Sequence, residues 1–335
     1  MIEAESKTEQ AEAPTPSSPD SLKDSGPAVS SDPPPKTSGG PLWRLMGMVK
    51  TIRPHQWVKN LFVLAPVVFA KDLFEPALLI RAFGAFGVFC LLAGAVYTLN
   101  DIVDVEADRL HPVKRHRPIA SGRVPIKLAK GLGIGLVVVG LGGAFYGPMS
   151  FFAVALSYIL LNIAYSFKLK NVAYLDVGCI ATMFVMRVAA GGYATGIEVS
   201  WYLIACTALL ALFLGFGKRR HELAQASRSA KQRAALQAYS PHALTAALAV
   251  TGVATIGTYV AYTLDPGTRA FFKSDWLWLT TPSVVNGVIR FVQLVAGRPK
   301  SESPTQEMLR DVPFVINLVV WAIIMMVIVY RLRPS

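Results

Sequence analysis

From Pro41 onward, the chain alternates long apolar stretches with short polar joints. An α-helix needs about 20 apolar residues to cross the hydrocarbon core of a bilayer, and nine stretches approach that length. They cover residues 57–74, 78–99, 128–147, 149–167, 172–194, 200–217, 243–264, 276–296 and 312–331. The first is the weakest, because Lys59 and Lys71 leave only a short uncharged centre. The pattern predicts an all-α, polytopic transmembrane helical bundle of about nine spans, with eight or ten as alternatives.

The first 40 residues have a different character. They contain seven Pro and eight Ser and no hydrophobic stretch. Such a segment cannot bury enough apolar surface to offset the entropy of ordering. We therefore expect residues 1–40 to form a disordered tail and residues 41–335 to form one transmembrane catalytic domain.

The high apolar content indicates a membrane protein, and the positive net charge indicates anionic partners. The set AVILMFWYC makes up 53% of the chain and charged residues only 16%, whereas an ordinary soluble domain has about 25% charged residues. The formal net charge is +12, although the tail is acidic, so the apolar remainder is strongly basic. A basic membrane protein suits anionic lipid or an anionic substrate. The high hydropathy argues against nucleic-acid binding. Composition does not decide whether the chain forms a homo-oligomer.

The basic residues cluster in alternate joints. Residues 100–130 and 217–242 are rich in Lys and Arg, whereas the joints near residues 148, 196 and 270 have few. By the positive-inside rule, the basic joints and the N-terminal tail are expected to be cytoplasmic.

An acidic motif stands at the end of the second predicted span, where the sequence reads NDIVDVEAD from Asn100 to Asp108. On one continuous helix, Asp101, Asp104 and Asp108 would share a face, with Asn100 beside them. Carboxylates gathered in this way suit Mg²⁺, which usually keeps several waters and bridges to substrate phosphates. The motif predicts a magnesium site made by these three aspartates. The alternative is a solvated, acid-rich helix end.

A basic, proline-bounded loop follows within ten residues and contains Lys114, Arg115 and Arg117. A membrane anchor would explain some of these charges. Their place next to the acidic face is typical of a site in which Mg²⁺ neutralises one part of a phosphorylated ligand and basic side chains hold another.

Further polar residues interrupt or flank the apolar stretches. Asp176 and Arg187 share a face of one predicted span, and a charged residue within a span is costly unless it faces the bundle interior. Gln56 and Asn60 share a face at the start of the first span. The remaining candidates at span ends are Lys59, Tyr165, Lys170, Lys218 and Arg219.

The pattern NDxxDxxxD at the end of the second span resembles the first aspartate motif of the UbiA-type intramembrane prenyltransferases, and the likeness runs from about Arg53 to Tyr330. The resemblance implies an all-helical protein, typically of nine spans, that binds a prenyl diphosphate through Mg²⁺ held by two aspartate motifs. The chain departs from this pattern at the second motif. There Asp176 is followed four residues later by Ile180 instead of a second acid.

With this departure, the stretches 53–60 and 111–122, Arg187 with the Ala190-Gly191-Gly192 run, and Lys218-Arg219 resemble one branch, the decaprenyl-phosphate phosphoribosyltransferases. The resemblance implies a Mg²⁺-dependent pentosyltransferase of the bacterial inner membrane, with its active site facing the cytoplasm. Its donor would be 5-phosphoribosyl 1-diphosphate and its acceptor a polyprenyl phosphate. The product, polyprenyl-phosphoryl-5-phosphoribose, would serve cell-wall arabinan synthesis.

On this interpretation the catalytic residues are Asp101, Asp104, Asp108 and Asp176. The substrate-binding residues are Gln56, Lys59, Asn60, Asn100, Lys114, Arg115, Arg117, Tyr165, Lys170, Arg187, Lys218 and Arg219. Two alternatives remain. One is a prenyltransferase that alkylates an aromatic acceptor, which a complete second DxxxD motif would favour. The other is a membrane carrier for an anionic phosphorylated lipid, which should show broken spans near the bilayer midplane.

Overall fold

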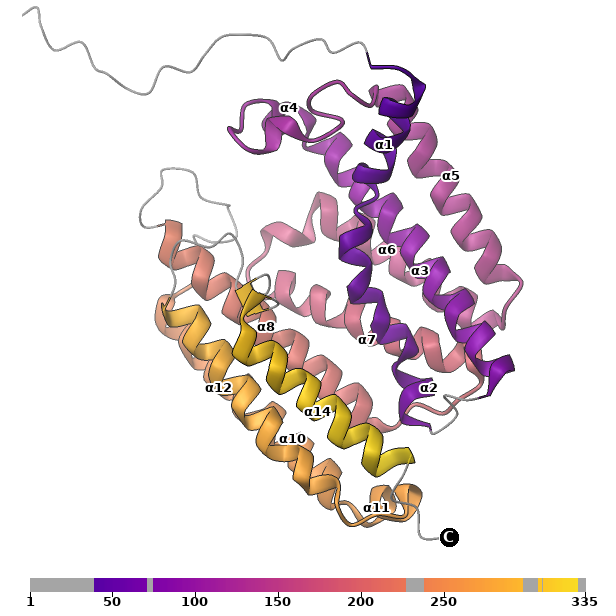
Figure 1. The fold of residues 1–335 in the computed structure, drawn as a ribbon. Coiled ribbons are helices and arrows are strands. Elements are labelled where there is room, and N and C mark those ends of the chain that lie inside the picture. The colour runs from indigo at the N-terminus through magenta and orange to yellow at the C-terminus, as the bar shows by residue number, and fades with distance from the viewer. Residues whose placement is uncertain (1–38, 71–74, 227–237, 298–306, 309, 331–335) are drawn as a thin grey trace, which may run out of the picture. The chain divides into compact units, whose positions relative to one another are not determined.

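The computed structural model describes residues 39–70, 75–226, 238–297, 307–308 and 310–330 (Figure 1). Residues 1–38 of the expected disordered tail lie outside this range. All regular elements in the described part are helices, which confirms the all-α fold class.

Eight helical segments of the described residues are long and apolar enough to cross a membrane. They are α3 (Pro76–Val103), α5 (Ile126–Phe145), α6 (Met149–Phe167), α7 (Leu175–Thr195), α8 (Trp201–Ala226), α10 (Pro241–Leu264), the joined η4 (Leu277–Thr280) and α12 (Thr281–Gly297), and α14 (Val312–Tyr330). Their apolar composition follows the predicted stretches closely. Short helices lie between them: α4 (Val105–Arg109), η2 (Lys114–His116), η3 (Leu169–Asn171) and α11 (Pro266–Phe272).

The first predicted span, residues 57–74, is not a long α-helix. The chain instead forms α1 (Pro41–Thr51), the 3₁₀ helix η1 (Pro54–Leu64) and the short α2 (Ala65–Phe69), and residues 71–74 lie outside the described part. A proline removes a backbone donor and ends or bends a helix, and both Pro54 and Pro66 fall in this segment. Polar Lys59 and Asn60 interrupt the apolar pattern as well.

This broken segment nevertheless runs the length of the bundle (Figure 1). Arg53, at its start, contacts Asp101 near the end of α3, whereas Val68, near its end, accepts a hydrogen bond from Tyr330 at the end of α14. One face of it packs against α3 and α7, where Asn60 and Val63 are buried, whereas Val58 and Leu61 on its other face are about half exposed. The described residues therefore contain eight helices that could cross a membrane, which is the lower alternative to the nine predicted, and this broken segment stands where the first predicted span was expected.

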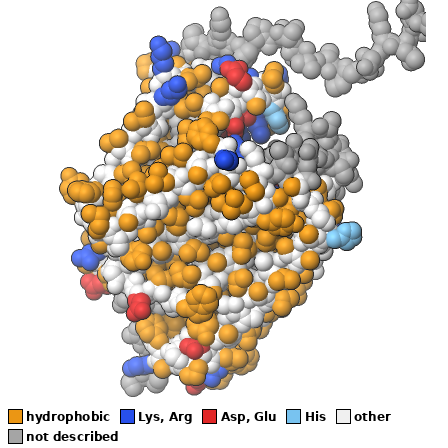
Figure 2. Space-filling view, turned by 180° about the vertical axis from the view of Figure 1, so that it is seen from behind, with side chains coloured by type: hydrophobic (Ala, Val, Ile, Leu, Met, Phe, Trp, Pro, Cys, Tyr) orange, Lys and Arg blue, Asp and Glu red, His pale blue; other side chains and the backbone are white. Residues whose placement is uncertain are grey.

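A glycine allows the closest approach in this packing. A Cβ atom at Gly191 of α7 would lie 1.9 Å from the carbonyl oxygen of Val63 in η1. Buried side chains from several helices, among them Phe89, Phe151 and Tyr158, form the adjoining core. Hydrophobic side chains cover the middle of the face shown in Figure 2, and charged ones lie mainly toward its two ends, as expected of a multi-pass membrane protein.

Candidate functional site

A cavity of about 1900 Å³ lies within the bundle, between η1, α7, α8 and the C-terminal helices. Six of the predicted substrate-binding residues line it: Gln56, Lys59, Asn100, Tyr165, Arg187 and Lys218. Most of the remaining lining is apolar or aromatic, including Phe62, Phe69, Phe184 and Trp321. One cavity therefore joins a basic region to an apolar one, which suits an amphiphilic anion such as a lipid phosphate.

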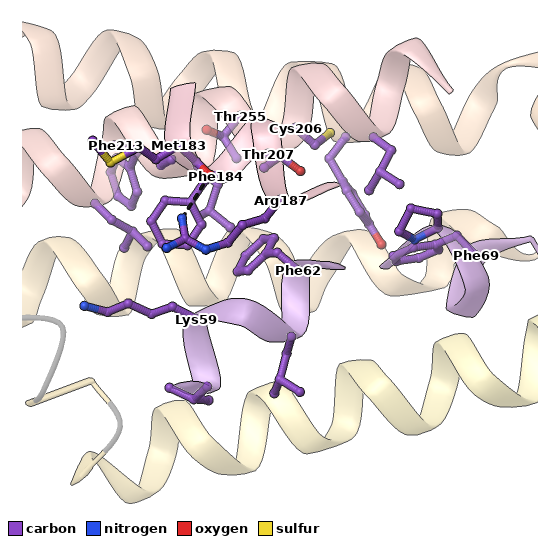
Figure 3. A pocket seen from close by; sticks show the side chains of 18 of the residues that line it. Lys59, Phe62, Phe69, Met183, Phe184, Arg187, Cys206, Thr207, Phe213 and Thr255 are labelled. Carbon is purple, nitrogen blue, oxygen red and sulfur yellow. Dashed lines mark hydrogen bonds between the residues drawn. The ribbon is translucent and has the colours of Figure 1, made fainter. Parts of the chain in front are cut away.

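Arg187 of α7 is the most buried of the basic side chains that line this cavity, and Figure 3 shows it among the lining side chains. Its Nε donates to Asn60 Oδ1 at 2.9 Å, its Nη1 to the carbonyl oxygen of Met183 at 2.9 Å, and its Nη2 to the Tyr158 hydroxyl at 2.8 Å. The rings of Tyr158 and Phe184 lie 5.0 and 5.1 Å from its Cζ atom. These contacts hold a buried guanidinium in a fixed orientation.

A second group of charges occupies the end of the bundle where α3 stops. Asp101 Oδ1 lies 2.5 Å from Arg53 Nη2 and 3.2 Å from Arg117 Nη1, and the same Arg117 nitrogen lies 2.6 Å from Asp108 Oδ2. The side chains of Asp101 and Asp108 are only 3% and 4% exposed. We call Arg53, Asp101, Asp108 and Arg117 the charged end.

Asp104 does not join the other two aspartates. Helix α3 ends at Val103 and α4 begins at Val105, so Asp104 lies at the junction and the single helical face expected from the spacing is interrupted. Its side chain is 43% exposed, and its Oδ1 lies 3.8 Å from Lys170 Nζ. Among the described residues, no group of three or more His, Cys, Asp and Glu is gathered closely enough to hold a metal ion.

The charged end nevertheless fits a divalent cation in part. Asp101 and Asp108 already converge on one positive group, the guanidinium of Arg117. Carboxylate oxygens are the ligands that Mg²⁺ prefers, and the ion is commonly held by one or two carboxylates together with substrate phosphates. Two converging carboxylates are therefore a suitable donor set for Mg²⁺ that arrives with a phosphorylated ligand.

Asp176, expected as a catalytic residue, is instead enclosed by protein partners. Its Oδ2 accepts from Arg219 Nε at 2.6 Å, and its Oδ1 accepts from the Tyr239 hydroxyl at 2.5 Å and from the backbone N–H of Val177 at 2.8 Å. Neither Asp176 nor Arg219 lines the cavity. This arrangement supports the junction of α7, α8 and α10 and leaves Asp176 poorly placed to touch a substrate.

A chain of contacts continues from this pair toward the cavity. Arg219 also forms an ion pair with Glu222, and Glu222 Oε1 lies 3.9 Å from Nζ of Lys218, which lines the cavity. Tyr239 also accepts a hydrogen bond from the backbone N–H of Tyr174. Burial, followed by the hydrogen bond to Asp176, raises the pKa of Tyr239 above its usual range.

Of the remaining predicted residues, one contacts a residue of the cavity and the others lie outside the cavity. Asn60 reaches the site through Arg187, and its Nδ2 contacts Cys90 Sγ at 3.3 Å. Lys114 and Arg115 are exposed on η2 and do not line the cavity. Lys170 lies outside the cavity lining, beside Asp104.

Residues of these networks that were not among the predicted site residues include Arg53, Tyr158, Glu222 and Tyr239. Arg53 belongs to the quoted stretch 53–60, but nothing local identifies it as the partner of Asp101, 48 positions away. Tyr158 lies inside an apolar run, and Tyr239 lies in a basic joint, 63 positions from Asp176. Their only sequence signal is a polar group near an apolar segment.

Comparisons with known proteins show the family of this chain. Residues 61–308 match the model of the UbiA prenyltransferase family. The chain is similar to the decaprenyl-phosphate phosphoribosyltransferase of Corynebacterium glutamicum, with 33% identity over 85% of this chain and 87% of the relative. It is also similar to the protein of that name from Mycobacterium tuberculosis, with 35% identity over 79% of this chain and 88% of the relative.

The fold is similar to a solved structure. A UbiA homolog from Archaeoglobus fulgidus, bound to DMAPP and Mg²⁺, superposes with a TM-score of 0.61 at 17% sequence identity. The match covers 85% of this chain and all of the other. At that identity the likeness concerns the fold.

Proposed function

The chain belongs to the UbiA prenyltransferase family, and from this premise we propose that it transfers a 5-phosphoribosyl group from 5-phosphoribosyl 1-diphosphate to a polyprenyl phosphate. The names of the relatives point to decaprenyl phosphate as the acceptor. The observation that carries the proposal is the cavity, in which Lys59, Arg187 and Lys218 stand at one region and apolar side chains line most of the rest. Such a cavity accommodates both an anionic reaction centre and an isoprenoid tail.

In this proposal, Asp101 and Asp108 hold Mg²⁺ at the charged end, with Asp104 at its edge. When bound, Mg²⁺ would withdraw charge from the departing diphosphate. Arg53 and Arg117 already lie against the same carboxylates, so they are placed to balance the remaining phosphoryl charge. The charged end would thus be the donor's diphosphate site.

The chemistry requires little proton transfer. The bond between ribose C1 and the diphosphate oxygen breaks, its electron pair leaves with diphosphate, and an oxygen of the acceptor phosphate forms the new bond to C1. Because the acceptor phosphate is ionised near pH 7, no general base has to activate it. Attack opposite to the leaving group would invert the configuration at C1.

The aromatic prenyltransferase alternative is weaker on geometry. In that reaction, two aspartate motifs would hold the prenyl diphosphate. Here the carboxylate of Asp176 is engaged by Arg219 and Tyr239, and Ile180 stands where the second acid of that motif would be. Arg219 thus supplies, next to Asp176, the positive charge that a second cation would bring.

We further propose that the charged end faces the cytoplasm of a bacterial cell, where the soluble donor is available. The basic loop with Lys114 and Arg115 lies at that end, which agrees with the positive-inside rule. The exposed bases would attract the anionic donor before it reaches the cavity.

Membranes that contain the protein test the proposal directly. They would be incubated with donor labelled in the ribose ring, polyprenyl phosphate and Mg²⁺, and then extracted with organic solvent. We expect label in the organic phase only when all three are present. Product that forms instead from a prenyl diphosphate and an aromatic acid would overturn the proposal in favour of the alternative.

A further inference from the structure

Arg187 differs from the other buried or half-buried arginines at this site. Arg53, Arg117 and Arg219 each contact at least one carboxylate. In the part of the chain that the structure describes, Arg187 forms no ion pair with a carboxylate. Its hydrogen-bond partners are an amide, a carbonyl and a hydroxyl, all of them neutral.

An uncompensated charge in the protein interior is costly, because desolvation is only partly offset by neutral partners. Arg187 is 6% exposed, and it lies twelve residues into α7, about 18 Å from the start of that helix along its axis. A guanidinium has five N–H groups, and these three hydrogen bonds use one on each nitrogen, so two N–H groups are left for a ligand. The site is therefore prepared to receive a negative charge.

A second basic side chain lines the same cavity. Lys59 of η1 lines it, and Figure 3 shows its amino group and the Arg187 guanidinium directed toward the same side of the pocket. Asn60, the neighbour of Lys59 in sequence, holds Arg187 Nε. Adjacent residues of η1 thus have two roles: Lys59 lines the cavity, and Asn60 orients Arg187 through a hydrogen bond.

The surroundings select the kind of anion. Phe62 and Phe184 lie beside Arg187, and Phe69 lies farther along the pocket (Figure 3). Trp321 also lines the cavity. A soluble, highly charged sugar diphosphate gains nothing from an apolar lining. The phosphate of an isoprenoid lipid, with its tail along that lining, does.

We propose that Arg187 and Lys59 bind the phosphate of the polyprenyl acceptor, whereas the charged end binds the donor. This inference rests on the proposed function and assigns its two substrates to separate bases. Arg187 is held by Asn60 and Tyr158 so that it meets the acceptor phosphate without rearrangement. The ribose C1 then lies between the two basic regions, and the acceptor oxygen approaches it from the cavity side.

Steady-state kinetics with the purified protein test this assignment. For Arg187→Gln and Lys59→Gln, we expect the KM for polyprenyl phosphate to rise about 10-fold or more, as loss of a charge-assisted contact predicts. The Kd of Mg²⁺-bound donor, measured without acceptor by calorimetry, should stay within about twofold. Arg109→Gln is the matched control, because Arg109 lies outside the cavity and contacts the exposed Glu106. A weakened donor Kd with an unchanged acceptor KM would overturn the assignment.

A binding measurement separates this inference from the reaction itself. Without donor, polyprenyl phosphate should raise the Tm of the detergent-solubilised protein more than the same polyprenol without phosphate. Lys59→Gln should lose that difference and remain folded, because the side chain of Lys59 is only partly buried and lines the cavity. Equal shifts for phosphate and alcohol in the unaltered protein would contradict the inference, even if transfer occurs. A phosphate-specific shift in a protein that transfers no phosphoribosyl would support the anion site and contradict the proposed function.

Discussion

Arg219 and Asp176 form an ion pair that is closed off from solvent. Arg219 Nε lies 2.6 Å from Asp176 Oδ2, and the two side chains are 3% and 1% exposed. Removing one partner of a buried pair costs about 3–5 kcal/mol when the other charge is left uncompensated. Because Arg219 keeps its ion pair with Glu222, we expect Asp176→Ala to lower the free energy of unfolding by less, about 1–3 kcal/mol, measured by denaturation in detergent.

The double variant Asp176→Leu with Arg219→Met is the control for this first prediction. It removes both charges, so it should be more stable than Asp176→Ala alone. A fully stable Asp176→Ala protein with a weakened donor Kd would show instead that this carboxylate serves the substrate.

The hydroxyl of Tyr239 links the same pair to the joint before α10. Because burial raises the pKa of Tyr239, the folded protein favours the protonated hydroxyl. Its contribution to stability is complete below the pKa of an unfolded tyrosine, about 10, and is lost as the pH rises through the higher folded pKa. We expect the Tm to fall as the pH rises above the pKa of an unfolded tyrosine. In Tyr239→Phe, which has no hydroxyl to titrate, this fall should be smaller. An identical alkaline profile in both proteins would mean that other groups cause the loss.

The role of the acidic motif can be tested by comparing two of its acids, the buried Asp101 and the exposed Glu106. Asp101 is buried between Arg53 and Arg117, whereas the Glu106 side chain is 77% exposed and forms an ion pair with Arg109. We expect Asp101→Asn to reduce turnover about 100-fold or more, because stabilisation of the leaving diphosphate is worth several kcal/mol. Glu106→Gln should stay close to the unaltered activity.

The assay for this pair includes Mg²⁺ titration of donor binding. Asp101→Asn should shift the titration to higher Mg²⁺ while the protein stays folded, because Arg53 and Arg117 are 26% and 29% exposed and water can solvate them. Near-normal turnover in Asp101→Asn would remove this carboxylate from the reaction centre.

Two glycines of α7 test the close packing of the broken first segment. At Gly191 a methyl group would meet the backbone oxygen of Val63, whereas at Gly178 it would meet open space. Gly191→Ala forces η1 and α7 apart, and overpacking of this kind typically costs about 1–3 kcal/mol or more. We expect a lower Tm and weaker acceptor binding for Gly191→Ala, and neither effect for Gly178→Ala. Equal Tm values for the two variants would mean that η1 does not pack here as described.

Features governed by local pattern could be predicted from the sequence. The apolar stretches gave the long helices, and the acidic motif directed attention to the end of α3. The helix break at Asp104 was not visible, because its surroundings have ordinary helical spacing. The 3₁₀ form of η1 also depends on packing against α3 and α7, which the sequence does not state.

Long-range pairing was the main feature that the sequence concealed. Arg187 was recognised as facing the bundle interior, but its contact with Asn60 spans 127 positions. Likewise, Asp176 is a lone acid in the sequence, and only the fold brings Arg219 and Tyr239 to it. The sequence can thus predict that a charged residue within a span faces the bundle interior, but it does not identify the residue that the charge contacts.

The position of the phosphorus atoms in the product tests the central claim most directly. The donor would be prepared in two forms, one with ³²P in the 5-phosphate and one with ³²P in the diphosphate, and each incubated with purified protein, polyprenyl phosphate and Mg²⁺. We predict that only the 5-phosphate label enters the lipid, with one diphosphate released for each lipid labelled. Diphosphate label in the lipid, or no lipid label from either form, would contradict the account.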